Sequence, residues 1–248
     1  MDYQNEVAPT QIKYSQADHD MWAHLYEQQV ALARRHGCKA YIRGLNDLGL
    51  PKDRALQLDE LNQRISPLTD WRFVPAPGAM KIEEVFECLS NRRFPLNLAM
   101  RVPEERYFAE LPDLFHDLFG HGPVLLDREI SALYQQFGAV ALKHIDDPSF
   151  VRLIGRLFWF TIEVGLIRED GALKAYGAAL LTSFHEITNV VRSRGAVAPL
   201  SLGGLAAAPY LFREVQQTYF ETPSFAALGA LLRELDQQRA EMRSTEPV

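Results

Sequence analysis

The sequence of 248 residues has few of the features that mark secreted or nucleic-acid-binding proteins. Its two cysteines, Cys38 and Cys88, lie far apart and in no CxxC motif, which favours a reducing compartment over a disulfide-stabilised fold. No run of five or more Lys or Arg residues occurs and the formal net charge is −6, which argues against nucleic acid as a partner.

Long apolar runs and targeting signals are missing as well. The longest apolar stretch, GRLFWFTIEVGLI, is short and interrupted by Glu163, so it cannot span a bilayer. The N-terminal sequence MDYQNEVAPTQ is polar and lacks the basic and apolar regions of a signal peptide. We therefore expect a cytoplasmic protein without membrane contacts.

The composition is that of an ordinary globular protein, with 47% hydrophobic and 23% charged residues. A chain of this length can bury a sizeable core without disulfides or structural zinc. No Gly/Ser-rich linker divides it. We predict a polar lead-in over residues 1–16 and a single domain over residues 17–248.

Hydrophobic periodicity predicts a mainly α fold with a small β component. Helices are expected over 18–36, 54–66, 81–91, 112–121, 127–144, 146–167, from about Gly177 to 192, and over 223–243. A strand is expected within 71–78, a strand or irregular return over 209–220, and a loop through Pro95 and Pro103. The 146–167 helix opens with Asp147-Pro148 and is apolar nearly all round, which indicates burial.

Two histidines stand out in the apolar segment LPDLFHDLFGHGPVLLD. His116 and His121 are five residues apart, a spacing that drifts off one face of an ideal α-helix. Both imidazoles could still point to a common site if the helix ended at His121, as Gly120 and Gly122-Pro123 suggest. The alternative is two ordinary histidines with satisfied hydrogen bonds.

Glu163 lies in an apolar helix that would not tolerate an unpaired charge, so it needs an ionic partner or a metal. Two histidines and one carboxylate form the facial triad of non-heme iron(II) oxygenases, and zinc hydrolases use the same ligand types. A buried salt bridge to an arginine is the structural alternative. These residues alone leave iron and zinc unresolved.

Three motifs together resemble the pterin-dependent aromatic amino acid hydroxylases, above all the short bacterial phenylalanine 4-hydroxylases. They are PDLFHDLFGHGP, FWFTIEVGLI and KAYGAALLTSF, and the resemblance runs from about Trp22 to Phe225. It implies the mainly helical catalytic fold of that family and places His116, His121 and Glu163 on its iron-ligand positions. The enzyme would use iron(II), molecular oxygen and a tetrahydropterin to hydroxylate an aromatic amino acid, with L-phenylalanine to tyrosine as the leading reaction.

The resemblance also implies substrate-binding positions. Arg101 falls on the arginine that pairs with the substrate carboxylate, a role that suits its bidentate, permanently charged fork. Pro112 and Trp159 fall on positions that wall the ring pocket, and Thr182 falls where the family has a serine. Val164 replaces a common phenylalanine beside the third ligand, so the pocket is expected to be larger.

Pterin binding is implied near APGAMKIEEVF, where Gly78, Ala79 and Met80 match the backbone-contact stretch. The expected stacking ring is replaced by Val85, so we expect the neighbouring Phe86 to substitute in part. Asp117 falls on an acidic position near the pterin.

The departures leave two alternative functions open. One is a relative acting on tryptophan, tyrosine or the meta position of phenylalanine, consistent with the changes at Val164, Ala109 and Ala179. The other is a non-catalytic helical metal-binding protein. The chain has no room for the regulatory domain and tetramerisation helix of the larger animal relatives, so a monomer, or at most a weak dimer, is expected.

Overall fold

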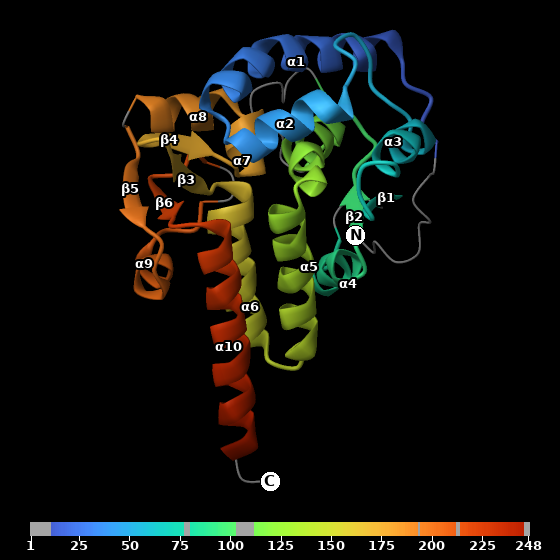
Figure 1. The fold of residues 1–248 in the computed structure, drawn as a ribbon. Coiled ribbons are helices and arrows are strands. Elements are labelled where there is room, and N and C mark those ends of the chain that lie inside the picture. Colours follow the sequence, from blue (N-terminus) through green and yellow to red (C-terminus); the bar gives the residue numbers. More distant parts are fainter. Residues whose placement is uncertain (1–10, 77–79, 103–111, 193, 212–213, 246–248) are drawn as a thin grey trace.

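The computed structural model describes residues 11–76, 80–102, 112–192, 194–211 and 214–245, with side chains to residue 242. Helices dominate, and two small sheets complete the described fold (Figure 1). The helices are α1 (Gln16–His36), α2 (Lys39–Leu48), α3 (Leu58–Ile65), α4 (Ile82–Ser90), η2 (His116–His121), η3 (Gly122–Leu126), α5 (Arg128–Lys143), α6 (Pro148–Phe158), η4 (Trp159–Glu163), α7 (Ala178–Thr182), α8 (Phe184–Val191), α9 (Leu202–Ala207) and α10 (Phe225–Thr245). The strands are β1 (Arg72–Pro75), β2 (Arg93–Leu96), β3 (Leu166–Glu169), β4 (Ala172–Ala175), β5 (Ala196–Pro199) and β6 (Thr218–Thr222).

Side-chain caps fix the start of the first helix. The Ser15 hydroxyl accepts a hydrogen bond from the Asp18 amide while the Asp18 carboxylate accepts one from the Ser15 amide. This capping box starts α1 at Gln16, inside the predicted lead-in. The chain just before it is also attached, because Ile12 and the Gln57 side chain exchange two hydrogen bonds.

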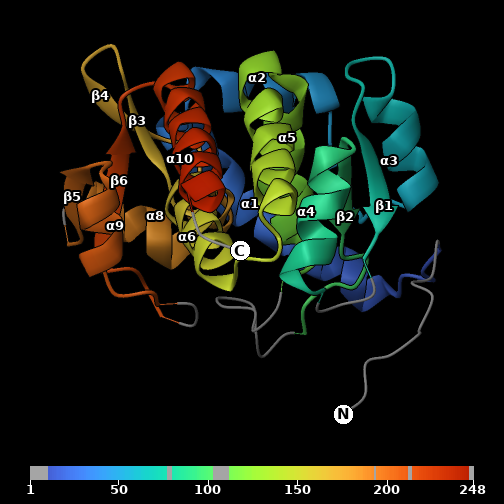
Figure 2. The same ribbon diagram turned by 90° about the horizontal axis from the view of Figure 1, so that it is seen from below.

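The long helices stand side by side in the middle of the molecule, with α5 packed against both α4 and α10 (Figures 1 and 2). Asp127 caps α5 by accepting from the amides of Glu129 and Ile130. Gly138 allows α4 to approach, because a Cβ there would lie 2.5 Å from the Phe86 carbonyl oxygen. The helices predicted over 81–91, 127–144 and 223–243 are confirmed.

The predicted buried helix over 146–167 is correct at its start and wrong at its end. Asp147 caps α6 and Pro148 occupies its first position, as expected. The helix then widens into the π-helical turn η4 and stops at Glu163. Residues 166–169 form β3, whose apolar start is buried within the sheet. A short apolar run does not distinguish a buried strand from a buried helix.

The larger sheet has the order β4-β3-β6-β5, with β3 antiparallel to β4, and β6 parallel to both β3 and β5. Asp170 and Gly171 form the β3–β4 turn in left-handed conformations, with φ of 50° and 77°. Helix was predicted from about Gly177 to residue 192. The structure has two short helices there, because Ser183 ends α7 and its hydroxyl caps the start of α8. Strand β5 and helix α9 were not predicted.

The loop predicted through Pro95 and Pro103 begins later than expected, because Pro95 lies in β2, paired in parallel with β1, and Pro103 lies outside the described residues. Both strands are edges of a two-stranded sheet, where a proline is tolerated. Helix α3 is shorter than the predicted 54–66.

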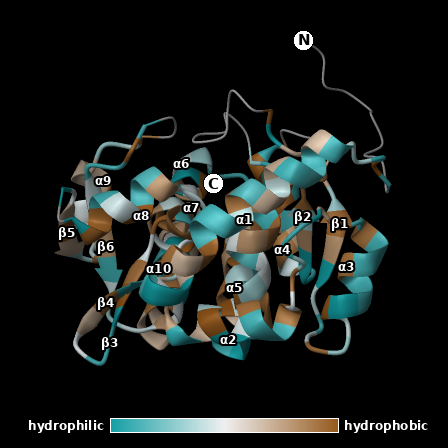
Figure 3. Cartoon of the chain, turned by 90° about the horizontal axis from the view of Figure 1, so that it is seen from above, coloured by the Kyte–Doolittle hydropathy of each residue, from teal (hydrophilic) through white to brown (hydrophobic). Residues whose placement is uncertain are grey.

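The buried apolar residues form one core between these elements. In Figure 3 the outer faces of helices such as α1 and α3 carry hydrophilic positions. Helix η2 lies inside this core against α7, and η3 packs on α2. Among the residues that the structure describes, we find no helix with the length and hydrophobicity that a membrane span requires.

Candidate active site

The first two residues of the site are presented by the π-helical turn η2, which begins at His116 and ends at His121. A π-helix closes its hydrogen bonds from i to i+5, so residues five apart come into register along its axis. The π-helical turn thus brings the two histidines together, where the sequence had suggested a helix end at His121. The imidazole centroids of His116 and His121 lie 5.2 Å apart.

Glu163, the last residue of η4, faces both imidazoles. Its Oε2 lies 3.4 Å from His116 Nε2 and its Oε1 lies 3.4 Å from His121 Nε2. The side chains are 16%, 3% and 14% exposed for His116, His121 and Glu163, so this cluster is largely shielded from water. The structure thus brings together the three predicted ligands, two from η2 and one from a second π-helical turn.

Charge complementarity stabilises this arrangement. Burial alone would raise the pKa of Glu163, but the imidazoles of His121 and His116 outweigh it and hold the pKa well below its ordinary value. Burial opposes the charged form of His116, whereas Glu163 favours it, and the net effect raises the pKa of His116. Glu163 is therefore an ionised carboxylate aimed at two imidazoles, a donor set that suits a divalent metal.

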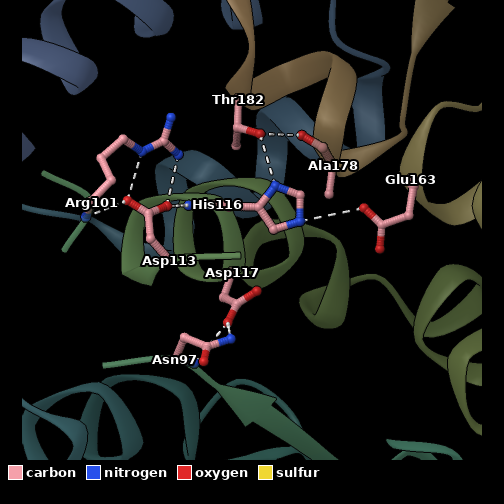
Figure 4. A network of polar contacts seen from close by, with 8 residues as sticks. All are labelled: Asn97, Arg101, Asp113, His116, Asp117, Glu163, Ala178 and Thr182. Atoms are coloured by element: carbon pink, nitrogen blue, oxygen red, sulfur yellow. Dashed lines mark hydrogen bonds and ion pairs between the residues drawn. The ribbon is translucent and has the colours of Figure 1, made fainter. Parts of the chain in front are cut away.

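The outer nitrogen of His116 is also held. Its Nδ1 lies 3.1 Å from Thr182 Oγ1, and the Thr182 hydroxyl donates its own hydrogen to the Ala178 carbonyl at 2.8 Å (Figure 4). A hydroxyl has one hydrogen, so Thr182 can only accept from His116. His116 Nδ1 therefore carries a hydrogen, and Nε2 is the ring nitrogen that faces Glu163.

A second carboxylate, that of Asp117, lies near the two histidines. One ligand atom each from His116, Asp117 and His121 lie within 4.8 Å of one another. However, Asp117 Oδ2 accepts hydrogen bonds from the backbone and side-chain nitrogens of Asn97, at 2.7 and 3.0 Å (Figure 4). Burial, which the histidines and Asn97 oppose, raises the pKa of Asp117 to about 6. We therefore favour Glu163, whose two oxygens both face Nε2 atoms, as the third ligand.

Arg101 forms a buried pair with Asp113. Its Nε and Nη2 each lie 2.7 Å from a carboxylate oxygen of Asp113, and the side chains are only 6% and 5% exposed (Figure 4). Burial would raise the pKa of Asp113, but the guanidinium holds it below its ordinary value. Asp113 also accepts from the His116 amide at 2.9 Å, so Arg101 is linked through Asp113 to the helix that carries the histidines.

The residues predicted to line the substrate-ring pocket differ in how deeply they are buried. Trp159 begins η4 and is half-buried, with its ring 5.3 Å from that of Tyr210. Val164 directly follows Glu163 and is completely buried. Pro112 is exposed. Tyr210, which sequence reasoning missed, carries no local signal because the contact joins residues far apart in the chain.

The predicted pterin residues are less well placed. Gly78 and Ala79 lie outside the described residues, and Met80 is half-buried. Phe86 is 1% exposed, and its ring packs edge-on against Phe158 with centroids 6.4 Å apart. A pterin could reach this ring only if α4 moved, so the structure disfavours Phe86 as a stacking partner.

The comparison with known families agrees with this geometry. A family model described as biopterin-dependent aromatic amino acid hydroxylase matches residues 1–242. The chain belongs to this family. It is therefore an aromatic amino acid monooxygenase that depends on a biopterin, and the alternative of a non-catalytic metal-binding protein is not supported.

Curated relatives include a phenylalanine-4-hydroxylase of Ralstonia nicotianae, 34% identical over 220 residues, which cover 87% of this chain and 69% of the relative. A phenylalanine 3-hydroxylase of Streptomyces coeruleorubidus is 32% identical over 213 residues, which cover 86% of this chain and 75% of the relative. The hydroxylase relatives thus include enzymes named for two ring positions.

Solved structures confirm the predicted fold class. Chromobacterium violaceum phenylalanine hydroxylase with bound iron(III) and 7,8-dihydrobiopterin superposes with a TM-score of 0.87 at 31% identity, covering 94% of this chain and 86% of that one. Its cobalt-bound form also gives a TM-score of 0.87 at 31% identity, covering 96% and 88%.

Proposed function

We propose that this hydroxylase acts on L-phenylalanine, which it converts to tyrosine with molecular oxygen, a tetrahydropterin and one iron(II). The iron would be held by His116, His121 and Glu163. When bound, it supplies the capacity to activate oxygen, which amino acid side chains lack. The related Chromobacterium enzyme, with bound iron and pterin, supports this choice of metal.

The observation that carries the proposal is the donor set itself. Both Nε2 atoms face the two oxygens of one ionised carboxylate, each at 3.4 Å. Thr182 holds the hydrogen of His116 on Nδ1, which leaves Nε2 as the nitrogen that a metal would bind. Two imidazoles and one carboxylate, all largely buried, fit an iron(II) centre.

The protein would bind and orient the reactants. Arg101 is proposed to anchor the substrate carboxylate with the guanidinium hydrogens that Asp113 does not use. Trp159, Val164, Thr182 and Pro112 are proposed to shape the ring pocket. Excluding water from this pocket would protect reactive species from side reactions.

The pterin is proposed to lie beside Gly78, Ala79 and Met80, with Asp117 at its polar edge. Asn97 orients the Asp117 carboxylate through two hydrogen bonds. Phe86 is buried, so we propose that backbone and polar contacts, not stacking on this ring, supply most of the pterin affinity.

Hydroxylation at the meta position is the second candidate. The Streptomyces relative named phenylalanine 3-hydroxylase is 32% identical, close to the 34% of the Ralstonia 4-hydroxylase. Val164, completely buried beside Glu163, is the residue whose size could turn the ring. A monomeric, cytoplasmic protein remains our expectation, and sedimentation velocity would measure the oligomeric state.

The test is tetrahydropterin oxidation coupled to ring hydroxylation in the iron-loaded protein, with phenylalanine, tyrosine and tryptophan as substrates. We expect tyrosine from phenylalanine, and loss of both iron and product in Glu163→Gln. Product that eluted as meta-tyrosine would favour the second candidate. Full iron content and rate in the variant would contradict the assigned ligands.

A further inference from the structure

The ring nitrogen of His121 that faces away from Glu163 is hydrogen-bonded to a tyrosine. Its Nδ1 lies 2.7 Å from the hydroxyl oxygen of Tyr134, a residue of α5 that is 1% exposed. The histidine and the tyrosine are thus joined by a water-shielded hydrogen bond between two helices.

The two histidines are held in different ways. The Thr182 hydroxyl gives its hydrogen to Ala178, so it can only accept from His116. The structure describes no other hydrogen bond for the Tyr134 hydroxyl, which can therefore donate to His121 Nδ1 or accept from it. One imidazole has a preset tautomer, and the other has a partner that suits both tautomers.

We infer that Tyr134 is the positioning residue of His121, holding its ring while the imidazole takes the tautomer that a metal requires. The inference rests on the metal site proposed above. A metal on Nε2 requires the hydrogen on Nδ1, and the Tyr134 oxygen then accepts it. Without the metal, the same hydroxyl can donate to Nδ1 while Nε2–H faces Glu163.

Orientation follows from the same bond. Rotating the imidazole by half a turn would replace Nδ1 with a carbon next to Tyr134 and Nε2 with a carbon next to Glu163. Phe94 lies over the ring at a tilt of 38° with centroids 4.8 Å apart, but packing does not distinguish the two orientations, because an imidazole keeps nearly the same outline after half a turn. The hydrogen bond between Nδ1 and the Tyr134 hydroxyl therefore favours the observed orientation of the ring.

Tyr134→Phe tests this role because it removes only the hydroxyl and keeps the ring in the core. The matched control is Tyr176→Phe, since Tyr176 is 2% exposed and its hydroxyl bonds to Thr222 Oγ1 at 2.6 Å. Cobalt(II) affinity is measured by competition with a chelator. Tyr134→Phe should weaken it by about tenfold or more, as loss of an outer-shell partner does, and Tyr176→Phe should leave it unchanged.

A second measurement uses the unaltered protein loaded with zinc(II) and labelled with 15N-histidine. We expect His121 to carry its hydrogen on Nδ1, in slow exchange with water. Equal cobalt affinity in Tyr134→Phe and wild type, or an equal loss in both variants, would overturn the inference, as would a rapidly exchanging Nδ1 hydrogen. If the wild-type protein bound no cobalt at all, the proposed metal centre itself would fall.

Discussion

Single charged residues in this site are paired within the protein itself. Arg101 is held by Asp113 through two hydrogen bonds of 2.7 Å, and Glu163 is held between the two imidazoles. Such pairs are costly to break when buried, because the remaining partner becomes an uncompensated charge. The side chains that would bind substrate and metal are therefore oriented in advance.

Arg101→Ala should raise the KM for phenylalanine strongly, because the substrate carboxylate would lose its proposed partner. Losing one partner of a buried, hydrogen-bonded charge pair costs roughly 2–5 kcal/mol of binding free energy. Iron content should stay the same, since Arg101 does not face Glu163. Steady-state kinetics with metal analysis measures both. Asp113→Asn is the control that disturbs the pair but keeps the guanidinium, and it should raise KM less. An unchanged KM in Arg101→Ala would show that the arginine binds no substrate.

Val164→Phe should shift the products toward para-hydroxylation of phenylalanine and away from larger or differently oriented substrates. Val164 is completely buried directly after Glu163, so added volume there must be taken from the neighbouring pocket or core. A misfit of one methylene changes discrimination by roughly 1–3 kcal/mol. Chromatography of the products from phenylalanine and tryptophan measures the effect. An identical product ratio in wild type and variant would exclude Val164 from the ring pocket.

At the scale of elements, the site depends on the close approach of η2 to α7. A Cβ on Gly120 would lie 2.9 Å from Ala178 Cβ and 3.0 Å from Thr182 Cγ2. Glycine at this position thus brings Thr182 within reach of His116. In the sequence Gly120 indicated only the end of a helix, and the structure gives it this packing role as well.

Gly120→Ala should lower the free energy of unfolding by about 1–3 kcal/mol, because a methyl group would force two packed elements apart. It should also weaken metal binding, since Thr182 would shift relative to His116. Gly155→Ala is the control, because no heavy atom lies within 4 Å of a Cβ there. Alanine in that helix interior should stabilise by roughly 0.5–1 kcal/mol. Urea denaturation of both variants measures the difference, and equal stabilities would refute the packing argument.

At the scale of the whole molecule, ion pairs join the C-terminal helix α10 to the middle of the chain. Asp236 accepts from Lys143 at 2.9 Å and pairs with His144 Nε2 at 2.7 Å, and His144 is 3% exposed. Arg239 pairs with Asp147, the cap of α6, at 2.5 Å. The last helix is thereby attached to both α5 and α6.

Asp236→Asn should lower the unfolding free energy by about 1 kcal/mol at pH 7, since it weakens hydrogen bonds to two basic groups. Burial opposes ionisation, but Lys143 and His144 outweigh it and lower the pKa of Asp236. A lowered folded-state pKa means that the carboxylate stabilises above its unfolded pKa and that this contribution fades as the pH falls through the folded value. The variant and wild type should therefore converge in acid.

Urea denaturation from pH 7 to pH 3 measures this convergence. Asp170→Asn is the control, because Asp170 pairs with Lys39 at 2.6 Å where the two side chains are 77% and 59% exposed. Exposed ion pairs contribute little, so this variant should match wild type throughout. A deficit in Asp236→Asn that persisted unchanged in acid would contradict the assigned charge effect.

The sequence by itself determined the features that depend on neighbours along the chain. Caps such as Asp127 and Asp147 fix helix starts through bonds two or three residues away. Three spaced motifs indicated the family and the residues His116, His121 and Glu163, which the structure brings together.

Tertiary structure decided the features that join distant parts of the chain. The π-helical form of η2, the strand β3 and the burial of Phe86 depend on what packs against them. The outer partner of His121, Tyr134, came from a helix that periodicity could only describe as core. Such hydrogen bonds form because burial penalises every unpaired polar group. Local propensity does not indicate which distant residue will supply the partner, so they cannot be predicted from the sequence.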